Sequence, residues 1–119
     1  MSEILTYDNL FAGHEMPAVT DTAVVPLGAG SLARGTVLGR VTASGKCVPV
    51  DSSKSDGSQE PYAVLAADAH AAEADAVVPV YLTGIFNASA LTFGGTDAAD
   101  AHRTACRRLG MFLRDNVKA

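Results

Sequence analysis

The stretch that decides the fold is Val77-Val78-Pro79-Val80-Tyr81-Leu82-Thr83-Gly84-Ile85-Phe86-Asn87, the longest dense block of β-formers in the chain. Apolar side chains occupy both faces of this run at a period of two residues. One face carries Val78, Val80, Leu82 and Phe86, and the other carries Val77, Tyr81 and Ile85. We therefore predict a strand that is covered on both sides, within the subunit or by a neighbouring subunit. Pro79 has no N–H to give to a ladder, which favours a position at a strand start or an edge.

Length and composition indicate one domain with a thin core. The chain has 119 residues, and Ala supplies much of its hydrophobic fraction of 48%. There is no Trp to fill a large interior. A chain of this length buries a modest core, so further burial at a subunit interface is expected. The composition thus predicts a folded domain that forms an oligomer.

The charge balance argues against nucleic acid and membranes as partners. The net charge is −4, whereas nucleic acid or an anionic membrane surface requires a basic face. No apolar run approaches the roughly 18 residues of a membrane span. The first residues lack the basic and then apolar order of a signal peptide. Two cysteines that lie far apart form no disulfide framework, which favours a cytosolic chain with reduced thiols.

Residues 1–22 contain no pattern of a compact element, and two interpretations are open. They form either an N-terminal strand docked on the body or an arm that orders when it pairs with a partner's strand edge. The remaining residues, 23–119, are predicted to form a single β-rich domain. The apolar side chains available to an arm are Ile4, Leu5, Tyr7, Leu10 and Phe11.

The segments around the central run read as shorter strands. Strands are predicted over residues 23–27, 37–42, 47–50, 62–66 and 111–114. Residues 28–33 match the dinucleotide-loop pattern G-x-G-x-x-A, but a strand-like segment follows where that loop must open a helix, so a turn is predicted. Residues 51–61 are predicted to be an exposed loop, and residues 68–76 a single turn or an open connection.

One helix is predicted after the central run. Asp97 is its expected N-cap, and Gly110 is its expected C′ residue. Acidic residues at the start and arginines near the end suit the helix dipole. A stripe of small residues is expected to lie on a sheet, namely Ala98, Ala101, Ala105 and Leu109.

The chemistry-bearing residues form no catalytic constellation. His14, His70 and His102 lie in unrelated elements without metal-ligand spacing. His102 and Cys106 stand four apart on the helix, but two ligands without a third are a weak metal site. We therefore predict no catalytic residue, no metal and no cofactor.

Four segments resemble the lambda-type head decoration protein D family of bacteriophages. Residues 29–39 are similar to its Arg-Gly-x-Val-Leu motif, and residues 61–68 resemble a strand of that family. Residues 78–87 are similar to its Tyr-x-x-Gly-x-Phe hairpin, and residues 108–113 resemble its closing strand. The resemblance covers about residues 23–113, in the same order and spacing. Ala63 departs from a glycine that is common in the family.

The resemblance implies a mainly β fold with one short helix, of the β-clip type, that assembles as a homotrimer. It implies a non-enzymatic capsid protein that binds the major capsid protein at three-fold positions and stabilises the expanded phage head. The expected location is the outer surface of the virion, after synthesis in the bacterial cytoplasm. It also favours the arm interpretation, with the five apolar residues above as capsid contacts. The alternative is a small β-barrel enzyme or ligand-binding domain of the β-clip type.

Overall fold

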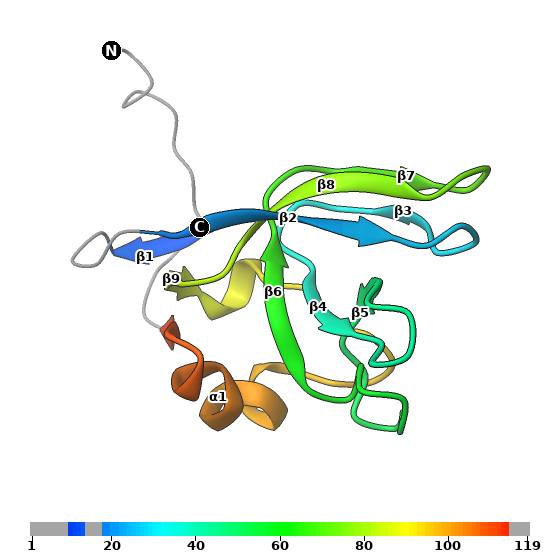
Figure 1. Ribbon diagram of the computed structural model, residues 1–119. Coiled ribbons are helices and arrows are strands. Elements are labelled where there is room, and N and C mark those ends of the chain that lie inside the picture. Colours follow the sequence, from blue (N-terminus) through cyan, green and yellow to red (C-terminus); the bar gives the residue numbers. More distant parts are fainter. Residues whose placement is uncertain (1–9, 14–17, 115–119) are drawn as a thin grey trace, which may run out of the picture.

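The structure is a computed structural model that describes residues 10–13 and 18–114. It is mainly β with one short helix, as the sequence predicts (Figure 1). The elements in chain order are β1 (Phe11–Gly13), β2 (Thr20–Val25), β3 (Gly30–Leu32), β4 (Val37–Arg40), β5 (Cys47–Pro49), β6 (Pro61–Leu65), β7 (Ala69–Ala71), β8 (Ala76–Tyr81), β9 (Gly84–Asn87), the 3-10 turn η2 (Ala88–Ala90), α1 (Ala99–Arg108) and β10 (Met111–Arg114).

A five-stranded antiparallel sheet forms the centre of the molecule. Its strand order is β2-β8-β6-β4-β5. Strands β2 and β8 run side by side over their whole length, and β6 crosses steeply from them (Figure 1). The predicted hairpin of residues 37–42 and 47–50 is present as β4 and β5, and the predicted strand of residues 62–66 as β6. Strands β6 and β8 are antiparallel neighbours, as expected from their short connection.

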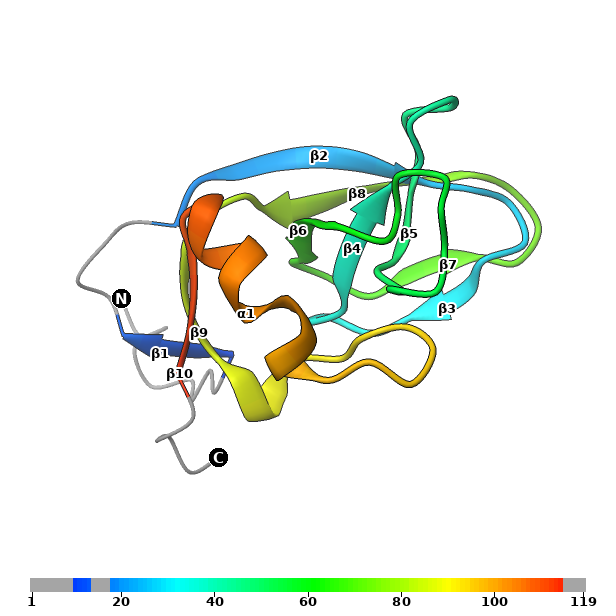
Figure 2. The ribbon, with the colours of Figure 1, turned by 90° about the horizontal axis from the view of Figure 1, so that it is seen from below.

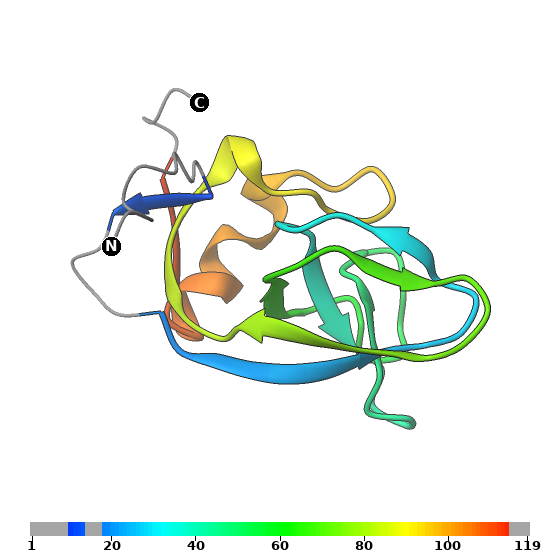
Figure 3. The ribbon, with the colours of Figure 1, turned by 90° about the horizontal axis from the view of Figure 1, so that it is seen from above.

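Two smaller sheets flank the central one. Strands β1, β9 and β10 form a three-stranded sheet in which β9 is central, antiparallel to β1 and parallel to β10. Strands β3 and β7 pair at the opposite end of the molecule, as Figure 3 shows. Strand β7 was not predicted, because residues 68–76 carry only alanines as apolar side chains. Residues 28–33 form a turn followed by β3, which confirms that they do not open a helix.

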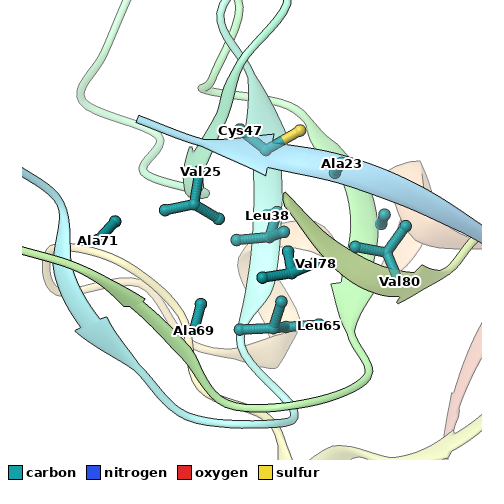
Figure 4. Close-up of a cluster of buried hydrophobic side chains, with 10 residues drawn as sticks. Ala23, Val25, Leu38, Cys47, Leu65, Ala69, Ala71, Val78 and Val80 are labelled. Carbon is teal, nitrogen blue, oxygen red and sulfur yellow. The ribbon is translucent and has the colours of Figure 1, made fainter. Parts of the chain in front are cut away.

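The first core cluster, called here the sheet cluster, fills the concave side of the central sheet. Leu38, Leu65 and Val78 point toward one another from three different strands (Figure 4). Cys47 of β5 packs in the same cluster as Ala23 of β2, so the two outer strands approach and the sheet curls around its contents. The members are Ala23, Val25, Leu38, Cys47, Ala63, Leu65, Ala69, Ala71, Val78 and Val80.

The second core cluster, called here the aromatic cluster, lies on the other face of the same sheet. Alternate residues of a strand point to opposite faces, so Val37 and Val64 face this cluster while their neighbours face the sheet cluster. Figure 2 shows helix α1 and the three-stranded sheet on this side of the central sheet, and both contribute residues to the cluster. The buried members are Leu10, Val37, Val50, Val64, Phe86, Ala88, Cys106, Met111 and Leu113.

The hairpin that the family resemblance implied for residues 78–87 is wrong. β8 and β9 do not pair with each other, because β8 belongs to the five-stranded sheet and β9 to the three-stranded one. Val77 is 72% exposed, so nothing within the subunit covers it and its covering by a neighbouring subunit stays a prediction. Pro79 lies inside β8, which is not an edge strand. The carbonyl of Pro79 accepts from the N–H of Ala66, just past the end of β6. The carbonyl of Ala66, which would face an N–H at Pro79, accepts instead from Nε of Arg34.

The helix begins one residue later than predicted and buries a different face. Ala98 is the N-cap and makes no side-chain hydrogen bond, whereas the carboxylate of Asp97 is hydrogen-bonded to His102. Gly110 has φ +89° directly after the helix, which confirms it as the C′ residue. The predicted small-residue stripe is wrong, because Ala98, Ala101 and Leu109 are exposed. The buried helix residues are His102 and Cys106.

The predicted exposed loop over residues 51–61 is confirmed for most of its length. Ser58 is an exception and is fully buried. Its backbone packs where a Cβ of Gly39 would stand, so the absence of a side chain on Gly39 permits the approach.

Candidate functional site

Strand β1 is the first strand of the folded body and lies at one edge of the three-stranded sheet. Phe11 lies opposite Phe86 in the antiparallel pairing of β1 with β9. Just before β1, the carbonyl of Leu10 accepts a hydrogen bond from the N–H of Asn87 at 2.7 Å. The side chain of Leu10 is 2% exposed and belongs to the aromatic cluster. Residues 1–9 are therefore tethered to a buried and hydrogen-bonded point of the body.

Three aromatic rings fix this tether. The ring of Phe11 stacks on Phe86 with centroids 5.2 Å apart and meets Tyr81 edge-on at 5.0 Å. Such pairs contribute about 0.5–1.5 kcal/mol beyond their burial. A Cβ at Gly84 would stand 3.0 Å from Phe86 and 3.3 Å from Phe11, so glycine leaves the space in which the two rings meet.

The predicted capsid-binding residues divide into two groups. Ile4, Leu5 and Tyr7 lie outside the described residues, so their role stays a prediction. Leu10 and Phe11 are described and pack into the subunit, with Leu10 buried and Phe11 half-buried. Their apolar character was evident from the sequence, but their partner strand β9 was not, because it lies more than seventy residues away in the chain.

A polar trio, absent from the sequence-based predictions, joins the start of α1 to the loop after β5; His102 is buried, whereas Ser52 is exposed. The hydroxyl of Ser52 donates to Oδ1 of Asp97 at 2.7 Å, and its N–H donates to Oδ2 at 2.7 Å. Nε2 of His102 lies 2.7 Å from Oδ2 of the same carboxylate. The ring of Phe93 stacks on the imidazole at 5.7 Å. The trio holds two distant loops together, and its spacing in sequence gives no local signal.

These bonds also favour the ionised form of Asp97. The Ser52 hydroxyl bond, followed by the His102 bond, lowers the pKa of Asp97 below its usual value. An ionised carboxylate only accepts hydrogen bonds, so Nε2 of His102 carries the hydrogen between them. Although Ser, His and Asp occur together, the serine hydroxyl is bonded to the aspartate rather than to the histidine. This arrangement activates no nucleophile, because that requires the base to take the hydroxyl proton.

The His102 and Cys106 pair is part of the core. Both side chains are buried on the inner face of α1. Burial raises the pKa of the Cys106 thiol to about 11, so it is protonated at neutral pH. Within residues 10–13 and 18–114, no three His, Cys, Asp or Glu side chains are grouped to hold a metal ion. Cys47 and Cys106 are free thiols in different clusters.

A basic hollow of about 490 Å³ opens between α1 and β10. We call it the arginine hollow. Three of its lining residues come from the helix and three from the strand, and the sequence showed only the helical arginines as a cluster. The strand brings in a further cation and an aromatic side chain. The lining residues are Arg103, Thr104, Arg107, Phe112, Leu113 and Arg114.

Comparison with known protein families agrees with this architecture. The family model described as bacteriophage lambda head decoration protein D matches residues 2–115 of the 119-residue chain. The chain belongs to the phage lambda head decoration protein D family. A search of curated proteins found no match. Membership confirms the resemblance drawn from the four motifs and extends it to the N-terminal segment.

Membership in the decoration protein family gives the coarse function. The chain is a phage head decoration protein, and its place is on the capsid of a virion. Among the described residues, no helix is long and apolar enough to cross a membrane.

Proposed function

We propose that this decoration protein is a non-enzymatic homotrimer of the β-clip type that stabilises the expanded phage head. The trimer sits on the outer surface at three-fold positions, after synthesis in the host cytoplasm. An N-terminal arm within residues 1–22 pairs with the major capsid protein. The observation that carries the proposal is the tether at β1, which fixes the end of an apolar segment to the edge of a small sheet.

The tether supports an arm that acts outside its own subunit. β1 is an outer strand of its sheet, so one side of its backbone is not used by β9. A strand at the edge of a sheet can add a strand from another chain. In this proposal Leu10 and Phe11 seat the base of the arm, whereas Ile4, Leu5 and Tyr7 contact the capsid. Burying side chains of this size contributes roughly 1.5–3 kcal/mol each, less the cost of ordering the arm.

The outer face of β2 and β8 supports self-association. Val24 and Val77 are directly opposite each other on this face, and Val77 is 72% exposed. Pro79, also exposed, follows two residues along the same face. An apolar strip of this kind suits a subunit contact. In a trimer, binding of one arm raises the effective concentration of the other two at the capsid. The overall affinity then exceeds that of a single arm by 10²-fold or more.

The test is deletion of residues 2–9, which leaves Leu10 and Phe11 in the core. The shortened protein should fold, remain a trimer by light scattering, and fail to bind expanded heads that lack the decoration protein. Deletion beyond Leu10 is less informative, because it also removes a buried core residue.

A matched pair of substitutions locates the contact. Tyr7→Ala should weaken head binding about tenfold or more, because a large apolar contact is lost, whereas the neighbouring Thr6→Ala should change it little. Full binding by the deletion variant refutes the arm. A monomeric full-length protein at micromolar concentration refutes the trimer.

A further inference from the structure

Exposed apolar side chains gather at two separate places on the subunit. Among the described residues, the large hydrophobic side chains that are exposed are Val19, Leu27, Tyr62, Val77, Leu109 and Phe112. The guanidinium of Arg40 lies over the ring of Tyr62, 5.9 Å from its centroid, so this ring has a partner within the subunit. The other five fall into two groups, one near each end of β2.

The first group, called here the β8 strip, lies where β2 ends and β8 begins. It consists of Val24, Leu27 and Val77. Val24 is directly opposite Val77, which is the most exposed of the large apolar side chains described. The N–H of Leu27 donates to Oδ1 of Asp75 at 2.6 Å, and this bond holds Leu27 beside the turn that leads into β8. The strip is therefore a continuous apolar surface of the rigid ladder between β2 and β8.

The second group, called here the turn patch, surrounds the sharp turn between α1 and β10. It consists of Val19, Leu109 and Phe112. The N–H of Val19 donates to Oγ1 of Thr83, and a Cβ at Gly110 would stand 3.1 Å from the side chain of Thr83. Figure 2 accordingly shows the beginning of β2 beside the end of α1. Residues far apart in the sequence thus form one apolar surface at this end.

The strip and the patch are distinct surfaces, as a trimer requires. In a two-fold dimer one surface can meet its own copy, but in a three-fold ring each subunit presents two different surfaces to its two neighbours. Val19 and Val24 stand five residues apart on an extended segment. At about 3.3 Å per residue this separates the two groups by roughly 17 Å. A single neighbour-facing side chain cannot contact both.

Charges beside the two surfaces are of opposite sign. Glu73 lies in the turn before β8, four residues before Val77. Arg107 and Arg108 end α1, directly before Leu109. Within the described residues, none of these three charged side chains is part of an ion pair. Contact between two strips would bring like carboxylates together, whereas contact between a strip and a turn patch brings a carboxylate toward guanidinium groups.

We propose that the β8 strip of one subunit packs against the turn patch of the next, and that three such contacts close the homotrimer. This inference rests on the proposed function and adds to it the two surfaces that meet. The chain has no Trp and many alanines, and its own core leaves both groups uncovered. A second copy of the chain supplies the missing cover, with an apolar centre and charges at the rim.

Substitution by lysine tests each side of the contact. Val77→Lys and Phe112→Lys each place a charge in the apolar centre, and Val77→Lys also brings it toward the arginines of the turn patch. Each should raise the concentration at which the trimer dissociates by about tenfold or more, measured by light scattering. Tyr62→Lys, which changes an exposed apolar residue outside both surfaces, is the matched control and should leave the mass unchanged. Circular dichroism on each variant separates loss of assembly from loss of fold.

Cysteine cross-linking tests the pairing without destabilising the subunit. The double variant with Val77→Cys and Phe112→Cys should give covalent dimers and trimers with a short bismaleimide, because every contact brings one cysteine of each kind together. Each single variant should give none. The native thiols Cys47 and Cys106 are buried, so the unmodified protein treated in the same way is the control.

The outcomes separate this inference from the proposed function. A full-length protein that is monomeric at micromolar concentration refutes the trimer and the contact together. A trimer that survives Val77→Lys, or a trimeric double-cysteine variant that forms no cross-links, refutes the contact while the trimer stands. Covalent dimers from Val77→Cys alone would show that the strip meets its own copy, which also overturns the proposed pairing.

Discussion

The two core clusters lie on opposite faces of one curled sheet and are built in different ways. The sheet cluster is aliphatic, with four alanines, and its members fall between residues 23 and 80. The aromatic cluster draws on residues from Leu10 to Leu113 and includes Phe86, Met111 and, around it, Phe11 and Tyr81. The buried polar residues Asn87 and His102 also lie on this side. The first cluster forms a scaffold from nearby strands, whereas the second joins the two ends of the described chain and supports the base of the proposed arm.

The largest expected effect comes from removing the central ring of the aromatic cluster. Phe86 is fully buried, so Phe86→Ala should cost about 3–5 kcal/mol in the free energy of unfolding, measured by urea denaturation. Because Phe11 stacks on this ring, amide hydrogen exchange in β1 and β10 should accelerate more than in β2 and β8.

The matched change in the sheet cluster is Leu65→Ala, which should cost about 2–5 kcal/mol. Its effect on exchange should be greatest in β2, β6 and β8. If both variants accelerate exchange uniformly, the two clusters unfold as one unit and the distinction between them is not energetic.

A smaller effect is expected at two glycines with positive φ. Gly110 has φ +89°, and a Cβ there would stand 3.1 Å from Thr83, whereas Gly28 has φ +96° and open space around it. Gly110→Ala should destabilise by about 1–3 kcal/mol, and Gly28→Ala toward the lower end of that range, because only backbone strain applies there. Thermal unfolding of the two variants measures the steric part as their difference. Equal losses would show that Thr83 moves aside at no cost.

A pH-dependent effect is expected at Asp97. The bonds from Ser52 and His102 lower its pKa in the folded state below the value of about 3.9 typical of an unfolded chain. The ionised carboxylate therefore contributes stability above that value, which is lost as the pH falls through the lower folded-state pKa. Asp97→Asn should be less stable than the unmodified protein at pH 7, with the gap closing below about pH 4.

Denaturation curves between pH 2.5 and pH 7 measure this gap. Asp100→Asn, three residues on and 94% exposed, serves as the control and should show a much smaller gap at every pH. A gap for Asp97→Asn that does not depend on pH contradicts the assignment of an ionised carboxylate.

The reaction rates of the two thiols compare the two core clusters with the least perturbation of the protein. Burial raises the pKa of both Cys47 and Cys106, so a thiol reagent at pH 8 reacts when the surrounding cluster opens. Cys106 should react faster, because its cluster is closed partly by the short outer strands β1 and β10. Rates in Cys106→Ala and Cys47→Ala variants give each site separately. Identical rates that follow global unfolding would indicate a single cooperative core.

The sequence predicted most of the scaffold and little of the surface that we propose binds the capsid. Period-two alternation located β2, β4, β5, β6 and β8, because each strand is read from its own residues. The same alternation could not show that residues 77–87 divide between two sheets, since β9 finds its partners β1 and β10 at the two ends of the chain. The helix face was misassigned because it is His102 and Cys106, and not the alanines, that meet the core. The arginine hollow needed β10 beside α1, which no local pattern encodes.

The parallel pairing of β10 with β9 has a consequence for synthesis on the ribosome. The sheet cluster holds no residue beyond Val80, so it can close while the last third of the chain is still being made. The aromatic cluster cannot close until Met111 and Leu113 have emerged from the ribosome. Until then the cluster that Leu10 and Phe11 pack against is incomplete. The surface proposed to bind the capsid is therefore completed last during synthesis.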